Sequence, residues 1–198
     1  VKLTGTDPGV TSAYNGGTHM TFEDTGIMRC IPGLTIFEPA DPVSLKQLVA
    51  EAALHPGCTY MRLHRKSVPN IYSEKACLKL GRAEIISAGE DLTIIASGSV
   101  CLNESLKAAE NLKKKGIRAE IIDLHTTKPL GAETVIKSAN KTGAVITVEN
   151  HQIINGLGSA VAEVLSENSP CLLKRIGIMD EFGEVGTQEY LMERFGLT

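Results

Sequence analysis

The chain has 198 residues, of which 42% are hydrophobic and 22% are charged, so it has enough apolar material for a folded core and does not resemble a disordered chain. Its formal net charge of −3, its 4% aromatic content and its lack of Trp argue against a nucleic-acid-binding surface. No stretch approaches the roughly 20 apolar residues that cross a bilayer. We therefore expect neither nucleic acid nor a membrane among its partners.

The five cysteines lie far apart, and no two of them have the spacing of a metal knuckle or a redox motif. They predict reduced thiols in a cytoplasmic protein and no metal site. The chain begins with Val1 and carries no basic-then-apolar leader. We therefore expect no targeting segment, and we expect the sequence to be a fragment of a longer protein.

The first part of the chain predicts a strand–helix–strand unit. Residues 1–6, 34–39 and 58–65 are apolar runs typical of strands. Between the last two runs, Asp41 provides an N-cap and Pro42 a first-turn proline for a helix. Strand, helix and strand at this spacing predict parallel pairing with a right-handed crossover.

Residues 66–81 contain proline and several charges without a clear period, and they are interpreted as an interdomain linker. The expected domains are therefore residues 1–72 and 73–198.

Strands and helices alternate again in the second part of the chain. The predicted strands are 92–97, 118–124, 144–150 and 171–178, and the predicted helices are 102–115, 132–140, 158–166 and one that Thr187 caps and Gly196 ends. Apolar runs without two-residue alternation are typical of strands that are covered on both faces. The sequence thus predicts an α/β fold with two open, mostly parallel sheets flanked by helices.

Open parallel sheets bind ligands at the carboxyl ends of their strands, so the loop of residues 7–19 is a place to look for chemistry. Its candidate residues are Asp7, Asn15 and His19, and its glycines allow close backbone approach to a ligand. A neutral imidazole can accept or donate a proton near neutral pH. A histidine in a loop is more often a surface or structural residue, so His19 alone does not decide the function.

A second candidate, Arg65, lies between His64 and Lys66 where another predicted strand ends. A planar guanidinium at this edge could hold a phosphate, sulfonate or carboxylate through two hydrogen bonds. A solvated basic strand end explains the same residues equally well.

Three further features favour structural explanations. Gly156 and Gly158 open a helix after a strand, but Val161 stands where a dinucleotide fingerprint has a small residue, which favours a tight turn. Residues 149–151 end a strand without a nucleophile or metal set nearby. An acidic cluster is interpreted as a solvated loop; its members are Asp180, Glu181 and Glu184.

The order of several segments resembles the transketolase family. GGTHMTFEDTGIMRCIPGLTIFEPADPVSLKQLV, from residue 16 to residue 49, is similar to the family's pyrimidine-domain stretch, in which a Gly-x-Thr-His motif precedes an acidic helix. GRAEIISAGEDLTIIASGS is similar to the start of the family's C-terminal domain, and IIDLHTTKPL, ITVENHQIINGLGSAVAEVL and EFGEVGTQEYLMERFGLT resemble its later blocks. Each motif is loose, but their order covers nearly the whole chain. The resemblance implies part of a pyrimidine-binding domain followed by a transketolase C-terminal domain.

The resemblance also implies roles for the candidate residues. It makes His19 the catalytic residue that bonds the hydroxyl of the transferred two-carbon unit and Arg65 the residue that binds the substrate phosphate. Asn15 stands where the family usually has an acidic residue that contacts the sugar, and Asp7 stands where it usually has a phosphate-binding His. Because an Asp would repel a phosphate, these two departures imply a relative with a different sugar substrate.

The implied reaction is transfer of a two-carbon ketol unit from a ketose to an aldose in carbohydrate metabolism of the pentose phosphate type. The implied cofactor is thiamine diphosphate with Mg²⁺, and no Gly-Asp-Gly motif that would hold its diphosphate occurs in this sequence. The implied partners are therefore an N-terminal transketolase section that holds most of the cofactor, a sugar substrate, and further copies in a homodimer or heterotetramer.

Two alternatives remain open at this point. The chain could be a section of another thiamine enzyme, either a 2-oxo acid dehydrogenase β subunit or a deoxyxylulose-phosphate synthase. It could also be a non-catalytic dimerisation or regulatory module.

Overall fold

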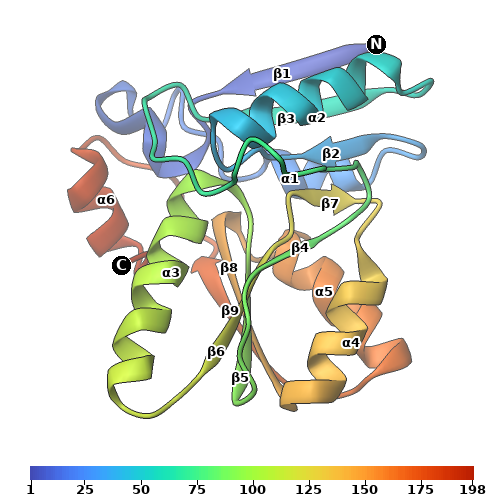
Figure 1. Cartoon of the computed structure of the whole chain (residues 1–198). Coiled ribbons are helices and arrows are strands. Elements are labelled where there is room, and N and C mark those ends of the chain that lie inside the picture. The colour runs from blue at the N-terminus through green and yellow to red at the C-terminus, as the bar shows by residue number, and fades with distance from the viewer.

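The computed structural model describes the whole chain, residues 1–198, and shows two sheets flanked by helices (Figure 1). The first sheet has the strand order β1-β3-β2-β7, and the second has the order β4-β6-β5-β8-β9. The strands are β1 (Lys2–Thr6), β2 (Thr35–Phe37), β3 (Thr59–Leu63), β4 (Glu84–Ser87), β5 (Leu92–Ala96), β6 (Ala119–Asp123), β7 (Thr126–Lys128), β8 (Ala144–Gln152) and β9 (Leu172–Ile178). Only β4 and β7 run antiparallel to their neighbours, so the predicted fold class is confirmed.

The helices are η1 (Gly9–Asn15, a 3₁₀ helix), α1 (Asp24–Arg29), α2 (Pro42–Leu54), α3 (Gly98–Lys114), α4 (Ala132–Thr142), α5 (Leu157–Asn168) and α6 (Gln188–Arg194). In Figure 1, α3 lies on one side of the second sheet and α4 and α5 lie on the other, while α6 packs beside η1. The short α1 lies between the two sheets and contacts β8. The loop that carries the candidate residues is thus bordered by both halves of the chain.

Helix α2 begins as its sequence predicts. The Asp41 side chain accepts a hydrogen bond from the Ser44 N–H at 2.7 Å, and the Ser44 hydroxyl accepts one from the Asp41 N–H at 2.9 Å. This reciprocal arrangement satisfies donors that have no partner within the helix, and Pro42 in the first turn has no N–H to satisfy.

The predicted linker contains neither helix nor strand, but the structure fixes it in place. The second carboxylate oxygen of Asp41 accepts hydrogen bonds from the N–H groups of Ile71 and Tyr72 at 2.7 and 2.8 Å. The Tyr72 hydroxyl donates to Asp123, at the end of β6, at 2.7 Å. One carboxylate therefore caps α2 and also holds the segment that leads into the second sheet.

The second sheet is covered on both faces, which explains its uninterrupted apolar strands. Ile94 of β5 packs in a cluster with Leu102 of α3, whereas the next residue, Ile95, packs in a cluster with Val161 of α5. All four side chains are buried. Burial on both faces removes the need for alternating polar residues.

Strand β7 connects the two sheets in a way that the sequence did not predict. It follows β6 closely in the chain but pairs antiparallel with β2, so residues 126–128 complete the first sheet. The Lys128 ammonium donates to the carbonyl oxygens of Arg29 and Ile31 at 2.8 and 2.6 Å. The predictions also omitted β4 and η1, and they started α3 at Leu102 although it begins at Gly98.

Candidate functional site

The carboxyl ends of β1 and β3 lie side by side, because Thr6 pairs with Leu63 in a parallel register. The Asp7 N–H extends this pairing by donating to the Leu63 carbonyl oxygen at 3.0 Å. The loop of residues 7–19 and the segment after β3 therefore start from the same edge of the sheet, as the topology of parallel strands predicts.

Two of the predicted site residues contact each other at this edge. One carboxylate oxygen of Asp7 lies 2.7 Å from a guanidinium nitrogen of Arg65. The Asp7 side chain is 7% exposed and the Arg65 side chain is 68% exposed. Arg65 also lines a cavity of about 200 Å³ with Lys66, and His19 does not contribute to that cavity.

The loop that carries His19 is tightly folded on itself. The buried Ser12 hydroxyl donates to the Asp7 carbonyl oxygen at 2.6 Å and lies 3.3 Å from the His19 carbonyl oxygen. The exposed His19 ring has its Nδ1 atom 2.9 Å from the Thr18 hydroxyl. Ser12 thus connects the backbone of His19 to the residue that pairs with Arg65, and Asn15 lies exposed in the same loop.

Asn150, at the end of β8, fixes the start of this loop from the second half of the chain. Its side-chain oxygen accepts from the Val10 N–H and its side-chain nitrogen donates to the Pro8 carbonyl oxygen, both at 3.0 Å. Gly9 between them has a φ of 61°, and a Cβ there would collide with Asn150. Of residues 149–151, Asn150 therefore supports the loop, a role that the sequence did not reveal.

A buried charged network lies directly beneath the same edge. The Arg62 guanidinium donates to Asp24 at 2.8 Å, to Glu38 at 2.7 Å and to the Asn150 carbonyl oxygen at 3.1 Å. Tyr60 donates to Asp24 at 2.7 Å. Burial by itself would raise the pKa of Asp24, but the charge and hydrogen bonds of Arg62 and Tyr60 bring it below its usual value.

This network was missed although one signal was available in the sequence. Arg62 stands in the middle of an apolar strand, and a charge at such a position requires buried partners. Its partners Asp24, Glu38 and Asn150 come from α1, the segment after β2, and β8. The network therefore joins the two sheets beneath the candidate loop.

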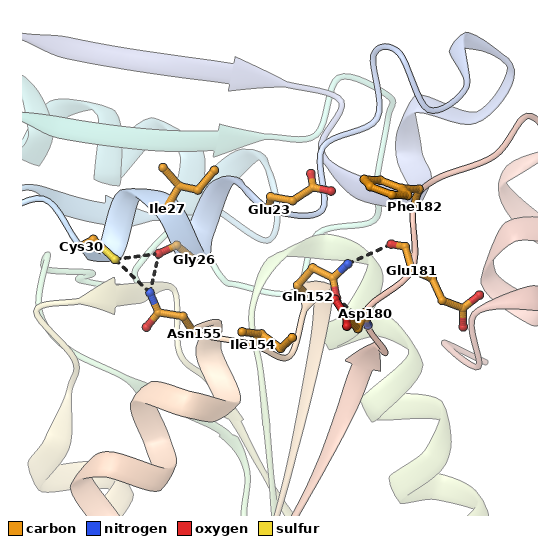
Figure 2. Close-up of a pocket in the computed structure, with 10 residues that line it drawn as sticks. All are labelled: Glu23, Gly26, Ile27, Cys30, Gln152, Ile154, Asn155, Asp180, Glu181 and Phe182. Atoms are coloured by element: carbon orange, nitrogen blue, oxygen red, sulfur yellow. Dashed lines mark hydrogen bonds between the residues drawn. The ribbon is translucent and has the colours of Figure 1, made fainter.

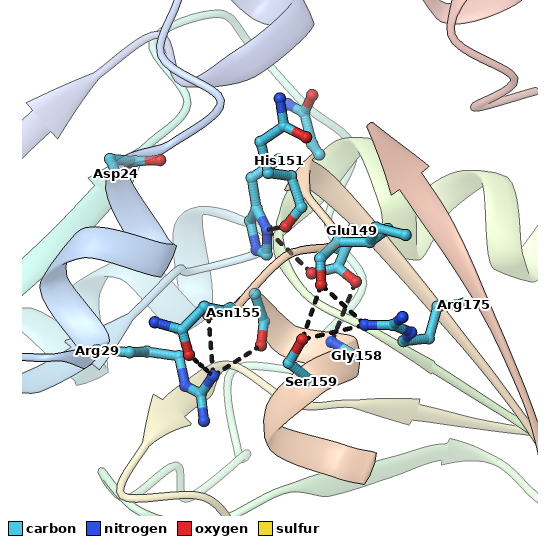
Figure 3. A network of polar contacts seen from close by, with 12 residues as sticks. Asp24, Arg29, Glu149, His151, Asn155, Gly158, Ser159 and Arg175 are labelled. Carbon is cyan, nitrogen blue, oxygen red and sulfur yellow. Dashed lines mark hydrogen bonds and ion pairs between the residues drawn. The ribbon is translucent and has the colours of Figure 1, made fainter. Parts of the chain in front are cut away.

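Figure 3 shows a second polar network beside the first. The Glu149 carboxylate accepts from the Gly158 N–H at 3.0 Å and lies 3.0 Å from Nδ1 of His151. A Cβ at Gly158 would come within 2.7 Å of Glu149, so the tight turn predicted at the start of α5 brings the backbone close to this carboxylate. Arg29 of α1 donates to Asn155 at 2.6 Å, which fastens α1 to the second half of the chain.

A cavity of about 370 Å³ lies between α1 and the segment after β9 (Figure 2). Ile27, Ile154 and Phe182 at this cavity are 63%, 57% and 89% exposed. The predicted acidic loop forms one wall: Asp180 donates its N–H to Gln152, and Glu181 pairs with Arg194. None of the four predicted site residues lines this cavity.

Three further findings concern the chain as a whole. No group of three or more His, Cys, Asp or Glu side chains is arranged to hold a metal ion. No helix is both long and apolar enough to cross a bilayer. All five cysteines are free thiols.

Comparison with known proteins gives matches along nearly the whole chain. The family model described as "Transketolase, pyrimidine binding domain" matches residues 1–70, and the model described as "Transketolase, C-terminal domain" matches residues 81–198. The 6-deoxy-6-sulfo-D-fructose transketolase subunit SqwH of Clostridium sp. (strain MSTE9) is 50% identical over 198 residues, which are 100% of this chain and 61% of that protein.

Two other similar proteins show the same partial coverage. An apulose-4-phosphate transketolase subunit of Phocaeicola vulgatus is 36% identical over 100% of this chain and 63% of its own length. A solved structure named "Split gene transketolase, inactive beta4 tetramer" is 39% identical with a TM-score of 0.92, over 100% of this chain and 63% of that one. The chain therefore spans less than two thirds of the length of these relatives.

Proposed function

Because the chain belongs to the transketolase family, we propose that it is the C-terminal section of a split transketolase, which transfers a two-carbon ketol unit from a ketose to an aldose. Residues 1–72 would form part of the pyrimidine-binding domain and residues 73–198 the C-terminal domain. The observation that carries the proposal is the position of His19 and Arg65 on adjoining loops at one sheet edge, connected through Ser12 and Asp7.

The proposed roles follow from the chemistry of these side chains. The exposed His19 imidazole would donate or accept a hydrogen bond at the hydroxyl of the transferred fragment. Arg65 would bind the anionic end of the sugar with the N–H donors of its exposed guanidinium that the contact with Asp7 leaves available. Asn15 would contact a sugar hydroxyl as a neutral hydrogen-bonding group.

We propose thiamine diphosphate with Mg²⁺ as the cofactor. The residues of this chain fit only its reacting end, where an exposed imidazole is available, because no set of side chains here is arranged as a metal site. The diphosphate and its Mg²⁺ would take their ligands from an N-terminal section. When bound, the cofactor supplies the electron sink for cleavage beside the ketose carbonyl.

The proposed partners are that N-terminal section and further copies of this chain, in a dimer or heterotetramer. The exposed apolar side chains around the cavity of Figure 2 support association, because large exposed apolar patches are typical of interaction sites. We place the assembly in the cytoplasm, where free cysteines stay reduced.

The proposed substrate is a ketose with an anionic end. The named relatives act on sugars with two different groups, a sulfonate in 6-deoxy-6-sulfo-D-fructose and a phosphate in apulose 4-phosphate. Arg65 could hold either group, because both present several acceptor oxygens to a guanidinium.

The test is an assay of the chain assembled with its N-terminal section and loaded with thiamine diphosphate and Mg²⁺. We expect aldose-dependent release of a shortened aldose from 6-deoxy-6-sulfo-D-fructose or D-fructose 6-phosphate. Decarboxylation of a 2-oxo acid without ketol transfer would favour the other thiamine enzymes. No turnover with any of these substrates would favour a non-catalytic module.

A further inference from the structure

The Asp7 carboxylate depends on Arg65 for its charge balance. One of its oxygens lies 2.7 Å from Arg65, and the other is buried without a hydrogen-bond donor. The backbone of Asp7 is also fixed, because its N–H donates to Leu63 and its carbonyl oxygen accepts from Ser12. Asp7 therefore cannot move into solvent without disturbing the loop that carries His19.

Because Asp7 needs this ion pair, Arg65 cannot offer all of its positive charge to a bound anion. If the guanidinium turned away completely, it would leave a buried carboxylate without a partner, and an unpaired buried charge is costly. Arg65 has five N–H donors, so it can keep one contact with Asp7 and offer the others to an anion. The anion then shares the positive charge of Arg65 with a carboxylate.

The other groups at this edge add one positive charge. Lys66 lines the same cavity as Arg65, and its ammonium lies 3.3 Å from the Gln188 side chain. Burial lowers the pKa of His64, which favours its neutral form. The Asp41 carboxylate lines the same cavity, but the N–H groups of Ser44, Ile71 and Tyr72 occupy its oxygens. Because the pair of Asp7 and Arg65 is neutral, the edge offers at most the one positive charge of Lys66.

We infer that Asp7 makes this edge selective for a ketose with a singly charged terminal group, a sulfonate, over one with a phosphate; the inference rests on the proposed function. A phosphate monoester carries about −1.5 to −2 charges at pH 7, and the charge beyond the first has no cation left to balance it. That additional charge instead faces the buried Asp7 carboxylate, which has no cation other than Arg65 and therefore repels it. A sulfonate carries one charge and matches the edge.

The variant Asp7→Asn separates charge from shape. Asn has the same size and tolerates the left-handed backbone of Asp7, whose φ is 53°. The matched control is Glu90→Gln, which removes a carboxylate from an exposed Arg118 ion pair just before β5. Both variants lose one negative charge from an arginine pair, but only Asp7 lies at the candidate site.

The experiment measures kcat/KM for 6-deoxy-6-sulfo-D-fructose and D-fructose 6-phosphate with the chain assembled with its N-terminal section and loaded with cofactor. We expect the wild type to prefer the sulfonate. Asp7→Asn should shift the ratio toward the phosphate by about tenfold, and Glu90→Gln should leave the ratio unchanged. Circular dichroism of each variant checks that the fold is retained.

Two results would overturn the inference: a wild type that prefers the phosphate, or an Asp7→Asn ratio equal to the wild-type ratio. A wild type that turns over neither sugar would refute the proposed function instead. The anion preference is then decided by calorimetry of the two sugars binding to the same assembly. The inference is supported if the wild type binds the sulfonate sugar more tightly than the phosphate sugar and Asp7→Asn abolishes this difference. Equal affinities of the wild type for the two sugars overturn it.

Discussion

The side-chain amide of Asn150 donates to the carbonyl oxygen of Pro8 at 3.0 Å, although 142 residues separate them. The same amide group accepts from the N–H of Val10. A short loop after a strand has few partners of its own, so these two bonds decide where it lies. The second half of the chain thus positions a loop whose candidate residues belong to the first.

Replacement of Asn150 by Leu should weaken both the fold and the activity. The Val10 N–H and the Pro8 carbonyl oxygen would lose their buried partner, which costs about 1 to 3 kcal/mol of unfolding free energy for an unsatisfied group. Because the loop carries His19, we also expect a lower kcat. Urea unfolding and steady-state kinetics of the assembled protein check both results.

The control is Asn103→Ala, since the Asn103 side chain donates only to Ser99 within its own helix α3. This variant should keep its kcat. A normal kcat in Asn150→Leu would show that the loop holds its position without the amide.

Replacement of Arg62 by Met should be strongly destabilising. Asp24 and Glu38 would remain buried without their cation, and breaking a buried ion pair on one side costs about 3 to 5 kcal/mol. The comparison variant is Arg118→Met, whose pair with Glu90 is exposed and should contribute less than about 1 kcal/mol. Equal urea midpoints for the two variants would contradict the assignment.

His19→Ala should lower kcat without lowering stability. The ring is exposed and its hydrogen-bond partner is the exposed Thr18 hydroxyl, so its loss leaves no buried group unpaired. A group that assists proton transfer typically contributes about a hundredfold or more, and we expect a decrease of that order with little change in KM. His55→Ala, at the end of α2, is the matched control and should retain activity. Unchanged kinetics in His19→Ala would remove this residue from the mechanism.

Stability should fall as the pH rises toward 8, because of Asp123. Burial raises the pKa of this carboxyl to about 8; the nearby charges of Glu38, Asp41 and Glu84 act in the same direction, and the Tyr72 hydrogen bond opposes them. The unfolded value is about 3.9, so the folded chain binds one more proton between the two values. The free energy of unfolding contributed by Asp123 therefore decreases with pH in this range.

His125 restricts where this decrease is visible. Burial lowers its pKa to about 4, so between about pH 4 and 6.5 the unfolded chain binds the additional proton at this residue. The two effects oppose each other there, and the net decrease is expected between about pH 6.5 and 8. Urea unfolding at several pH values should show this slope in the wild type and a flatter one in Asp123→Asn. The same slope in both proteins would contradict it.

Local signals explain what could be predicted from the sequence. Helix α2 follows from adjacent residues, Asp41 and Pro42, whose effect on the first turn does not depend on the rest of the fold. The edge that carries Asp7 and Arg65 follows from parallel pairing, because that pairing brings strand ends together whatever the side chains are.

The remaining features depend on contacts between distant segments. Residues 126–128 are too few and too polar to show a strand pattern, and they form β7 only because β2 offers an edge. Asn150 and Asp24 acquire their roles from partners in other segments, and no spacing within one segment reveals them. Of these residues, only Arg62 could have been recognised from the sequence, because it is a charged residue within an apolar strand.

The pairing of β7 with β2 has a consequence for protein engineering. A piece cut after residue 72 would keep β1, β2 and β3 but would lose the strand that covers β2. The uncovered β2 would present free backbone N–H and carbonyl groups, and such rows readily recruit strands from neighbouring molecules. Expression of the first sheet on its own should therefore yield aggregates, whereas a fusion that supplies residues 126–128 in place should remain dispersed.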